Sequence, residues 1–236
     1  MIVINHLTRM SRGYICVAGI DLKTGEHIRP TVPRDRLSSR LLTRHGGPFD
    51  IGNIINLAEI RPEPDPPHVE DRLISPDKII FEGVASAEEF WRILRNVSKH
   101  KLEDIFGAEL KNIGGSNYGT DAGQGQASLG CLLPYDRPKL YVKDQHSDRP
   151  QIRMWFKDGQ LNVDAPVNDL RLYSEDHFSN DMESLDRVRE LIKSSEGIIL
   201  SLGLTRAWAS SAQFEPVHWL QVNNIHLIEN PIWQLA

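Results

Sequence analysis

Two short alternating runs joined by a two-residue turn constrain the fold of this chain more than any other feature. Residues 151–157 and 160–165 alternate apolar and polar side chains, and Asp158-Gly159 lies between them. Alternation with a period of two is typical of a half-buried β-strand, and Asp-Gly is a strong signal for a tight hairpin turn. Because the turn fixes the register, the apolar side chains of the first run are expected to face the core: Ile152, Met154 and Phe156.

The segments around this hairpin follow a recognisable order. A short strand is expected at 139–143, before the hairpin, and a helix at 180–193, after it. The helix begins with a capping sequence, Asn180-Asp-Met-Glu183, and two longer strands follow at 197–208 and 217–228. Three strands, a helix and two strands is the order of an OB-fold, a five-stranded, partly open barrel.

The first third of the chain predicts the same order. A helix is expected over 36–44, where leucines recur at helical spacing before Gly46-Gly47-Pro48. Strands are expected on both sides of it, at 2–7, 14–20, 27–32, 51–60 and 78–81. We therefore predict a mainly β (α+β) protein with two OB-like five-stranded barrels, over residues 1–84 and 136–236.

The residues between the barrels differ in character. A helix is expected to begin at Ser86, because Ser86-Ala-Glu-Glu89 is a capping box, and a second short helix is expected over 102–110. The stretch Gly114–Gly130 holds six glycines in seventeen residues, which predicts no regular element. We interpret 85–135 as a helical and Gly-rich connector. The alternative is that Gly114–Gly130 is a lid that a ligand orders.

Composition excludes several classes of protein. Of the 236 residues, 40% are hydrophobic and 25% are charged, which is typical of a soluble globular chain. No apolar run approaches the ~18 residues that span a bilayer, and the N-terminus does not resemble a signal peptide. We expect a cytoplasmic protein that does not enter membranes. The net charge of −5 argues against a general nucleic-acid coat.

The sequence predicts no catalytic residue, metal or cofactor. Cys16 and Cys131 are too few for a disulfide framework or a thiolate zinc site, and both lie in apolar runs typical of inert buried thiols. His218 and His226 are too far apart along a strand, ~26 Å, to share a metal. His6 and His27 lie on separate strands, and nothing in the sequence brings them together.

Positive charge is concentrated at the N-terminus. Residues 1–48 carry a net charge of +5, whereas the remaining residues carry −10. Arginine, which provides most of this charge, suits bidentate binding of phosphate. We expect a positive patch where strand ends meet, with Arg9 and Arg34 beside its main members: Arg12, Arg29 and Arg36. The alternative is a basic flank that packs against an acidic part of the protein.

Two strands place an aromatic residue between cations on their outer faces. These are Lys139, Tyr141 and Lys143 on one strand and Arg153, Trp155 and Lys157 on the next. A flat ring flanked by cations suits single-stranded nucleic acid, because a base stacks on the ring while the cations meet phosphates. In the alternative, the middle helices cover both rings.

A further strand, 217–228, directs Trp219 and Gln221 away from the core. A tryptophan beside an amide side chain can stack on a base and read its edge, since amides both donate and accept hydrogen bonds. The alternative is that this face packs against a neighbouring domain.

Three segments resemble the bacterial family described as dual OB-containing domains. They are Cys16–Pro30, Ser201–Arg206 and His218–Leu227, and the resemblance extends over nearly the whole chain. It implies two OB-like barrels and a role in sensing nucleic acid or nucleotide in bacterial conflict. It implies no catalytic residues.

We therefore expect a binding module for single-stranded nucleic acid (RNA or DNA) or for a nucleotide-like ligand. Two alternatives stay open. One is a nucleotide-processing enzyme that uses Gly114–Gly130 as a lid, and the other is a scaffold whose surfaces meet only protein.

Overall fold

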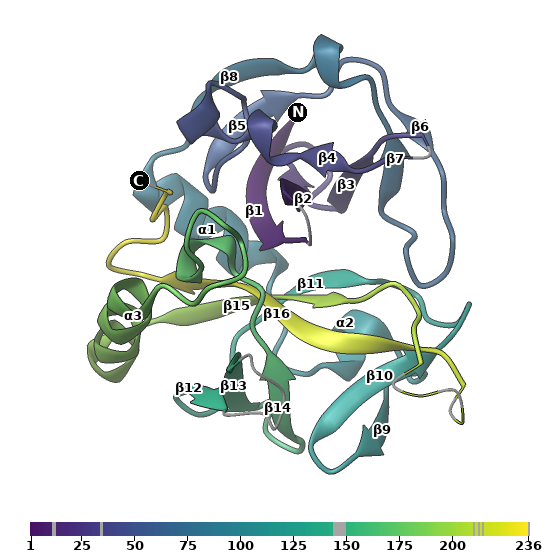
Figure 1. Ribbon diagram of the computed structural model, residues 1–236, viewed down its shortest axis with the longest axis vertical. Helices are drawn as coiled ribbons and strands as arrows, with labels where there is room; N and C mark the ends of the chain where they lie inside the picture. The colour runs from purple at the N-terminus through teal and green to yellow at the C-terminus, as the bar shows by residue number, and fades with distance from the viewer. Residues whose placement is uncertain are drawn as a thin grey trace.

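The strands of the first 84 residues form one curled sheet, drawn in purple and blue in Figure 1. The computed structural model describes residues 1–10, 13–33, 35–143, 150–209, 211, 213 and 215–235. The strand order is β6-β7-β3-β2-β1-β5-β8, and β4 pairs with β2. The strands are β1 (Ile2–Arg9), β2 (Tyr14–Asp21), β3 (His27–Thr31), β4 (Leu37–Ser38), β5 (Asn53–Asn56), β6 (Arg61–Pro62), β7 (Asp71–Leu73) and β8 (Ile80–Val84).

The chain from residue 111 onward forms two smaller sheets. The five-stranded sheet has the order β11-β15-β16-β10-β9, and the three-stranded sheet has the order β12-β13-β14. A bridge between Val167 and Val222 joins the end of β14 to β16. The strands are β9 (Lys111–Gly114), β10 (Asn117–Asp121), β11 (Leu129–Leu132), β12 (Lys139–Lys143), β13 (Gln151–Lys157), β14 (Asn162–Pro166), β15 (Ile198–Leu204) and β16 (Val217–Leu227).

In the part of the chain that the structure describes, three α-helices accompany the sheets. α1 (Ala87–Val97) begins as predicted, because the Ser86 side chain accepts a hydrogen bond from the backbone N–H of Glu89. α3 (Met182–Ser194) is capped in the same way by Asp181. α2 (Glu103–Phe106) is shorter than the helix predicted over 102–110. Short 3₁₀ turns lie at Ser39–Leu41, Thr43–His45, Pro76–Lys78 and Leu170–Leu172.

The prediction of a helix over 36–44 is wrong. Leu37 and Ser38 form β4, which pairs with Ile15 and Tyr14 of β2, and two 3₁₀ turns follow. The leucines at this spacing are therefore explained by core contacts from turns. Leu37 is buried and Leu41 packs partly buried against the same core, and local periodicity does not distinguish such contacts from one helical face.

The prediction that Gly114–Gly130 holds no regular element is also wrong. β10 lies within it and pairs with β9, which ends at Gly114, and β10 and β11 join the five-stranded sheet through β16 and β15. Glycine is required at Gly119, where a Cβ atom would lie 2.4 Å from the carbonyl oxygen of His218 on β16. Because hydrogen bonds to two strands hold this segment, the lid interpretation is wrong as well. The domain boundaries at 84 and 135 stay a prediction.

The two parts of the molecule meet along β1 and β16 (Figure 1). β1 is buried along almost its whole length, because its own sheet flanks it and β16 packs against it. The β1–β2 register shifts between Ile4 and His6, a bulge that changes the direction of the side chains that follow. Among the described residues, no helix is both long and apolar enough to cross a membrane.

Candidate ligand-binding site

A cavity of about 560 Å³ lies between the N-terminal sheet and the β15–β16 pair. Side chains of β1, β2 and β3 line one wall, and residues at the end of β15 and along β16 line the other. Its volume is within the range of ~300–1,000 Å³ that is usual for small-molecule sites. We call it the inter-sheet cavity.

Four arginines line the inter-sheet cavity, and two of them share one buried carboxylate. The Nε of Arg29 donates to Oδ1 of Asp71 at 2.6 Å, and Arg206 donates to Oδ2 of the same residue. Arg29 and Asp71 are 6% and 4% exposed. Arg29, which we predicted as a ligand contact, therefore lies in the wall with its charge paired.

The other two arginines, Arg9 and Arg36, keep more of their donors free of carboxylates. Arg9 donates from Nη1 to the carbonyl of His177 at 3.1 Å, and its guanidinium lies 4.0 Å above the ring of Tyr173. Arg36 is exposed. Within the described lining, Asp35 is the one acidic side chain set against the four arginines. The cavity is therefore suited to an anion.

Five buried polar atoms of this lining have no hydrogen-bond partner among the described residues, and one of them, Nη2 of Arg29, is ion-paired with Asp71. The other four are Nε2 of His6, Nε of Arg9, Oγ1 of Thr31 and Nδ1 of His68. Buried polar groups in folded proteins are nearly always paired, and leaving one unpaired costs ~1–3 kcal/mol. Their concentration in one cavity indicates a place where a ligand supplies the missing partners.

The two histidines present N–H donors to the cavity. Burial lowers the pKa of His6 well below its usual value, and Nδ1 of the neutral ring accepts from the Asn223 amide at 3.0 Å, which leaves the proton on Nε2. Burial, followed by the charges of Arg29 and Arg206, lowers the pKa of His68 to about 2. Nδ1 of His218 donates to the Thr205 carbonyl and therefore carries a proton. Nε2 of His68 lies against this N–H group and so has no proton of its own, which places the proton of the neutral His68 ring on Nδ1.

Aromatic and amide side chains lie at the β16 side of the cavity. Trp208 is 51% exposed and its ring centre lies 5.3 Å from that of Trp219. Gln221 accepts from the Asn168 amide at 2.6 Å and donates to Asn223 at 2.8 Å. Gln221 thus lines the cavity with both ends of its amide hydrogen-bonded within the protein, whereas Trp219 is not part of the lining and packs against Trp208.

The predicted stacking surface lies elsewhere, on the outer side of the three-stranded sheet. We call it the outer β12–β14 face. Lys139 lies opposite Trp155 in the register, and the Nζ atoms of Lys139 and Lys157 lie 5.6 and 5.4 Å from the centre of the Trp155 ring. The predicted parity of β13 holds, since Ile152, Met154 and Phe156 are fully buried on the other side and Trp155 is half-buried.

Two residues of this face that were predicted to bind a ligand form hydrogen bonds within the protein. Arg153 is 8% exposed and donates to Asp164 at 2.9 Å and to Asn117 at 3.0 Å, contrary to the expectation that it is free to meet a phosphate. Burial and a hydrogen bond with Asp164 raise the pKa of Tyr141, so its hydroxyl also belongs to this cluster. Lys139 and Lys143 are exposed, and Lys157 lies 3.0 Å from Asp136.

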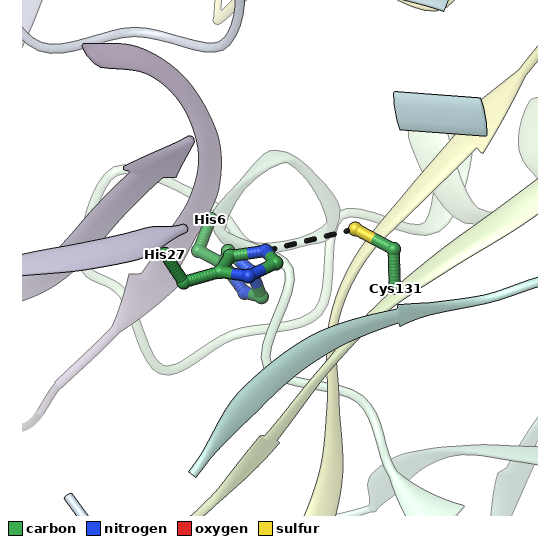
Figure 2. Close-up of side chains that lie close together, drawn as sticks. All are labelled: His6, His27 and Cys131. Atoms are coloured by element: carbon green, nitrogen blue, oxygen red, sulfur yellow. Dashed lines mark hydrogen bonds between the residues drawn. The ribbon is translucent and has the colours of Figure 1, made fainter. Parts of the chain in front are cut away.

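The structure also gathers three potential metal ligands that the sequence left apart. His6 on β1, His27 on β3 and Cys131 on β11 each place one ligand atom within 4.8 Å of the other two (Figure 2). Nε2 of His27 lies 3.8 Å from Sγ of Cys131. Burial lowers the pKa of His27 to about 4 and raises that of Cys131 to about 12.

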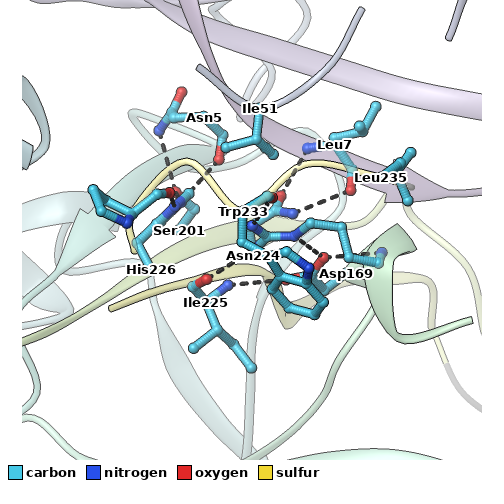
Figure 3. A network of polar contacts seen from close by, with 12 residues as sticks. Asn5, Leu7, Ile51, Asp169, Ser201, Asn224, Ile225, His226, Trp233 and Leu235 are labelled. Atoms are coloured by element: carbon cyan, nitrogen blue, oxygen red, sulfur yellow. Dashed lines mark hydrogen bonds and ion pairs between the residues drawn. The ribbon is translucent and has the colours of Figure 1, made fainter. Parts of the chain in front are cut away.

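A buried polar network fixes the strands around these residues (Figure 3). The Asn224 amide on β16 accepts from the backbone N–H of Leu7 at 2.7 Å and donates to its carbonyl at 3.2 Å. The Asn5 amide donates to Ser201, which contacts His226 at 3.0 Å. This network pairs polar side chains of β15 and β16 with β1, and so sets the distance between the walls of the cavity.

Some residues of the predicted binding groups line the inter-sheet cavity. Arg29, Arg36 and Gln221 line it as members of predicted binding groups, whereas Arg12 and Arg34 lie outside the described residues. Several lining residues carried no signal beyond their type: His6, Thr31, His68, Arg206 and Trp208. Cys16 also lines the cavity, and burial raises the pKa of its thiol, which is consistent with an inert cysteine.

Comparison with known families identifies the class of the protein. Residues 2–225 match the model of the family described as dual OB-containing domain. The chain therefore belongs to this family, and the prediction of a mainly β protein with OB-like domains is confirmed. The chain matched no protein of curated function and no protein of known structure.

Proposed function

We propose that this protein is a binding module for a phosphate-bearing, nucleotide-like ligand, held in the inter-sheet cavity. One observation carries the proposal: unpartnered buried donors and four arginines line the same cavity. Phosphate oxygens accept hydrogen bonds and carry negative charge, so they satisfy both features at once. An apolar ligand would leave the donors unpaired, and a cationic ligand would be repelled.

The other side of the cavity suits a nucleobase. Trp208 offers a half-exposed ring on which a base can stack, and Gln221 and Asn223 offer amide groups that both donate and accept. The OB-fold is a common carrier of such sites. A ligand with an aromatic ring at one end and phosphate at the other matches this arrangement better than free phosphate does.

A second candidate function is binding of single-stranded nucleic acid on the outer β12–β14 face. The observation that favours it is the half-buried Trp155 ring between Lys139 and Lys157. A base stacked on an aromatic residue contributes ~1–3 kcal/mol, with no requirement for a particular base. The two proposals use different residues, so variants can separate them.

Calorimetric titration with purine and pyrimidine nucleotides, the matching nucleosides and inorganic phosphate tests the first proposal. We expect nucleotides to bind at least about 10-fold more tightly than nucleosides, because a charge-assisted hydrogen bond contributes ~1.5–3 kcal/mol. Arg9→Gln should weaken nucleotide binding by a similar factor. Arg92→Gln on the exposed side of α1 is the matched control and should leave it unchanged. Absence of nucleotide binding, or binding indifferent to Arg9→Gln, overturns the proposal.

Two further readouts locate the ligand and detect the alternatives. Cys16 lines the cavity and Cys131 is fully buried, so a bound nucleotide should slow alkylation of Cys16. Product analysis after incubation detects turnover, which would favour an enzyme. Absence of binding to nucleotides and to labelled RNA and DNA would favour a scaffold that contacts only protein.

A further inference from the structure

We propose that His6, His27 and Cys131 form a binding site for one borderline-soft transition-metal ion, with Zn²⁺ as the ion that suits them best. The proposal does not rest on the proposed function, since His27 and Cys131 do not line the cavity. Imidazole and thiolate are ligands that Zn²⁺ prefers, and zinc sites with three protein ligands keep an open fourth position.

The distances fit one shared ion. With Zn–N and Zn–S bonds of about 2.0 and 2.3 Å at a tetrahedral angle, the nitrogen and sulfur ligands of one ion lie ~3.5 Å apart. Nε2 of His27 and Sγ of Cys131 lie 3.8 Å apart, and all three ligand atoms lie within 4.8 Å of one another. Small side-chain rotations therefore suffice to bring the three atoms to one ion.

The cluster is built from three strands that the fold holds rigidly. β1 and β3 each pair with β2, and β11 pairs with β15 in the other sheet. His6 is 2% exposed and Cys131 is fully buried. Ligands on paired strands of two sheets cannot separate without opening the junction of β1 and β16, so the site is preorganised.

One observation at His6 points to a ligand: its Nε2 is buried without a hydrogen-bond partner. In the metal-free chain the Asn223 amide donates to Nδ1 at 3.0 Å, so the ring proton lies on Nε2. Binding of an ion through Nε2 moves this proton to Nδ1, the nitrogen from which metal-bound imidazoles usually donate to another residue, and requires the Asn223 amide to turn its oxygen toward the ring. Sγ of Cys131 accepts from the Asn5 amide at 3.4 Å and lies 3.7 Å from Oγ of Ser201, contacts that involve no charged group.

His6 belongs both to the cluster and to the cavity lining, which gives an ion a route into the site. On binding, the Cys131 S–H bond breaks, the sulfur becomes a ligand as thiolate, and the proton leaves to solvent. Three protein ligands leave a fourth position for water or for a donor atom of the cavity ligand. No carboxylate belongs to this cluster in the described part of the chain.

Cobalt(II) titration of the chelator-treated full chain tests the proposal. Co²⁺ replaces Zn²⁺ in such sites, and its spectrum reports both a tetrahedral ion and a sulfur ligand. We expect one Co²⁺ per chain, visible absorption from the tetrahedral ion and near-ultraviolet absorption from the thiolate–cobalt bond. Added Zn²⁺ should abolish both bands. A spectrum without the sulfur band, or no saturable binding, overturns the proposal in favour of a metal-free hydrogen-bonded cluster.

The chain provides its own control because it has only two cysteines. Cys16→Ser should keep the sulfur band, which assigns it to Cys131 without altering the site. His27→Gln should weaken Zn²⁺ binding by at least about 100-fold, since even residues behind the ligands contribute 10–100-fold. If Cys16→Ser removes the band, the assignment to Cys131 is wrong. Nucleotide titration of the metal-free chain keeps this test separate from the proposed function.

Discussion

The inter-sheet cavity and the outer β12–β14 face are both basic and aromatic, but they are built in opposite ways. The outer β12–β14 face comes from three consecutive strands, and its register places Lys139 opposite Trp155 and Trp155 opposite Asp164. The cavity takes residues from β1, β2, β3, the segment before β7, and β15–β16. The residues of a surface formed by consecutive strands can be predicted from the alternation of their side chains. The residues that line a cavity between two sheets depend on how those sheets pack together.

The two regions also differ in how their charges are compensated. On the outer β12–β14 face, Arg153 and Lys157 have carboxylate partners in Asp164 and Asp136. In the cavity, Arg29 and Arg206 share Asp71, while Arg9 pairs with a carbonyl and an aromatic ring. An excess of donors is therefore left in the cavity, which is the condition for a ligand-binding site rather than a structural ion-pair network.

The largest expected difference between the two regions lies in their ion pairs. Asp71→Asn should reduce the free energy of unfolding by ~3–5 kcal/mol, because it leaves Arg29 buried without a counter-charge. Asp164→Asn should cost clearly less, since Asp164 is partly exposed and Arg153 keeps Asn117 and a backbone carbonyl. Urea denaturation of both variants measures the difference. Equal losses would contradict the view that only the cavity pair is deeply buried.

A second prediction concerns how the stability of the folded protein depends on pH. Burial lowers the pKa of His226 to about 4, with Arg171 also lowering it and Asp169 raising it. The pKa of His68, which faces Arg29, Arg206 and His218, is about 2. The unfolded chain binds protons on these rings near pH 6.5 and the folded chain does not, so stability falls as pH decreases below 6.5.

For each histidine that is protonated in the unfolded chain but not in the folded chain, the free energy of unfolding falls by ~1.4 kcal/mol per pH unit between the folded-state pKa and pH 6.5. Asp50 acts in the opposite direction, because burial raises its pKa to about 6 and the folded state then holds its proton. Urea denaturation of the metal-free chain between pH 7.5 and 5 measures the net slope. His226→Gln should reduce the slope, and a slope that this variant leaves unchanged would argue against a neutral buried His226.

The third prediction removes one tryptophan from each of the two regions and compares the effects on ligand binding. Trp208→Ala should weaken nucleotide binding, and Trp155→Ala should weaken binding of a single-stranded oligonucleotide, each by the ~1–3 kcal/mol typical of base stacking. Each variant should leave the other ligand's affinity unchanged. Fluorescence anisotropy with both probes provides the measurement. If both variants affect both ligands, the cavity and the outer β12–β14 face are one site.

Melting temperatures of the same two variants separate stacking from packing. Both rings are partly exposed, so neither change should cost the ~3–5 kcal/mol expected when an aromatic residue is removed from a core. A large loss of stability in Trp155→Ala would mean that the ring packs against the protein and does not serve as a stacking surface.

The smallest expected effect concerns Arg36, the exposed arginine at the cavity. Arg36→Gln should flatten the dependence of log affinity on log salt concentration by up to about one unit if this side chain contacts a phosphate. Binding titrations from low to moderate salt give the slope, with Arg92→Gln as control. An unchanged slope would mean that Arg36 serves only local contacts such as the one with Tyr14, whose ring centre lies 5.9 Å away.

The sequence by itself determined most of the longer strands, the core-facing side of β13 and the presence of the two capped helices. The alternation around Asp158-Gly159 correctly predicted that Ile152, Met154 and Phe156 face the core, because the side-chain period is a local property. The prediction of a two-residue turn is wrong, since the loop spans residues 158–161 and Lys157 pairs with Asn162; the facing of the side chains is unchanged because the loop is longer by an even number of residues. Ser86 begins a helix as predicted, and Asp181 begins the other one residue after the predicted cap Asn180, since a cap satisfies backbone donors within one turn. Local signals gave wrong predictions at 36–44 and at Gly114–Gly130, where pairing with distant strands determines the structure.

Only the tertiary structure decided which distant residues share a site. His6 and Cys131 are separated by more than half of the chain, yet the docking of β1 against the second sheet brings them to one cluster. Arg29 is a free cation in the sequence and a buried partner of Asp71 in the fold. The physical reason is that ligand-binding sites depend on the relative position of two sheets. That position is set by buried contacts such as those of Asn224 with Leu7, whose partners no local pattern connects.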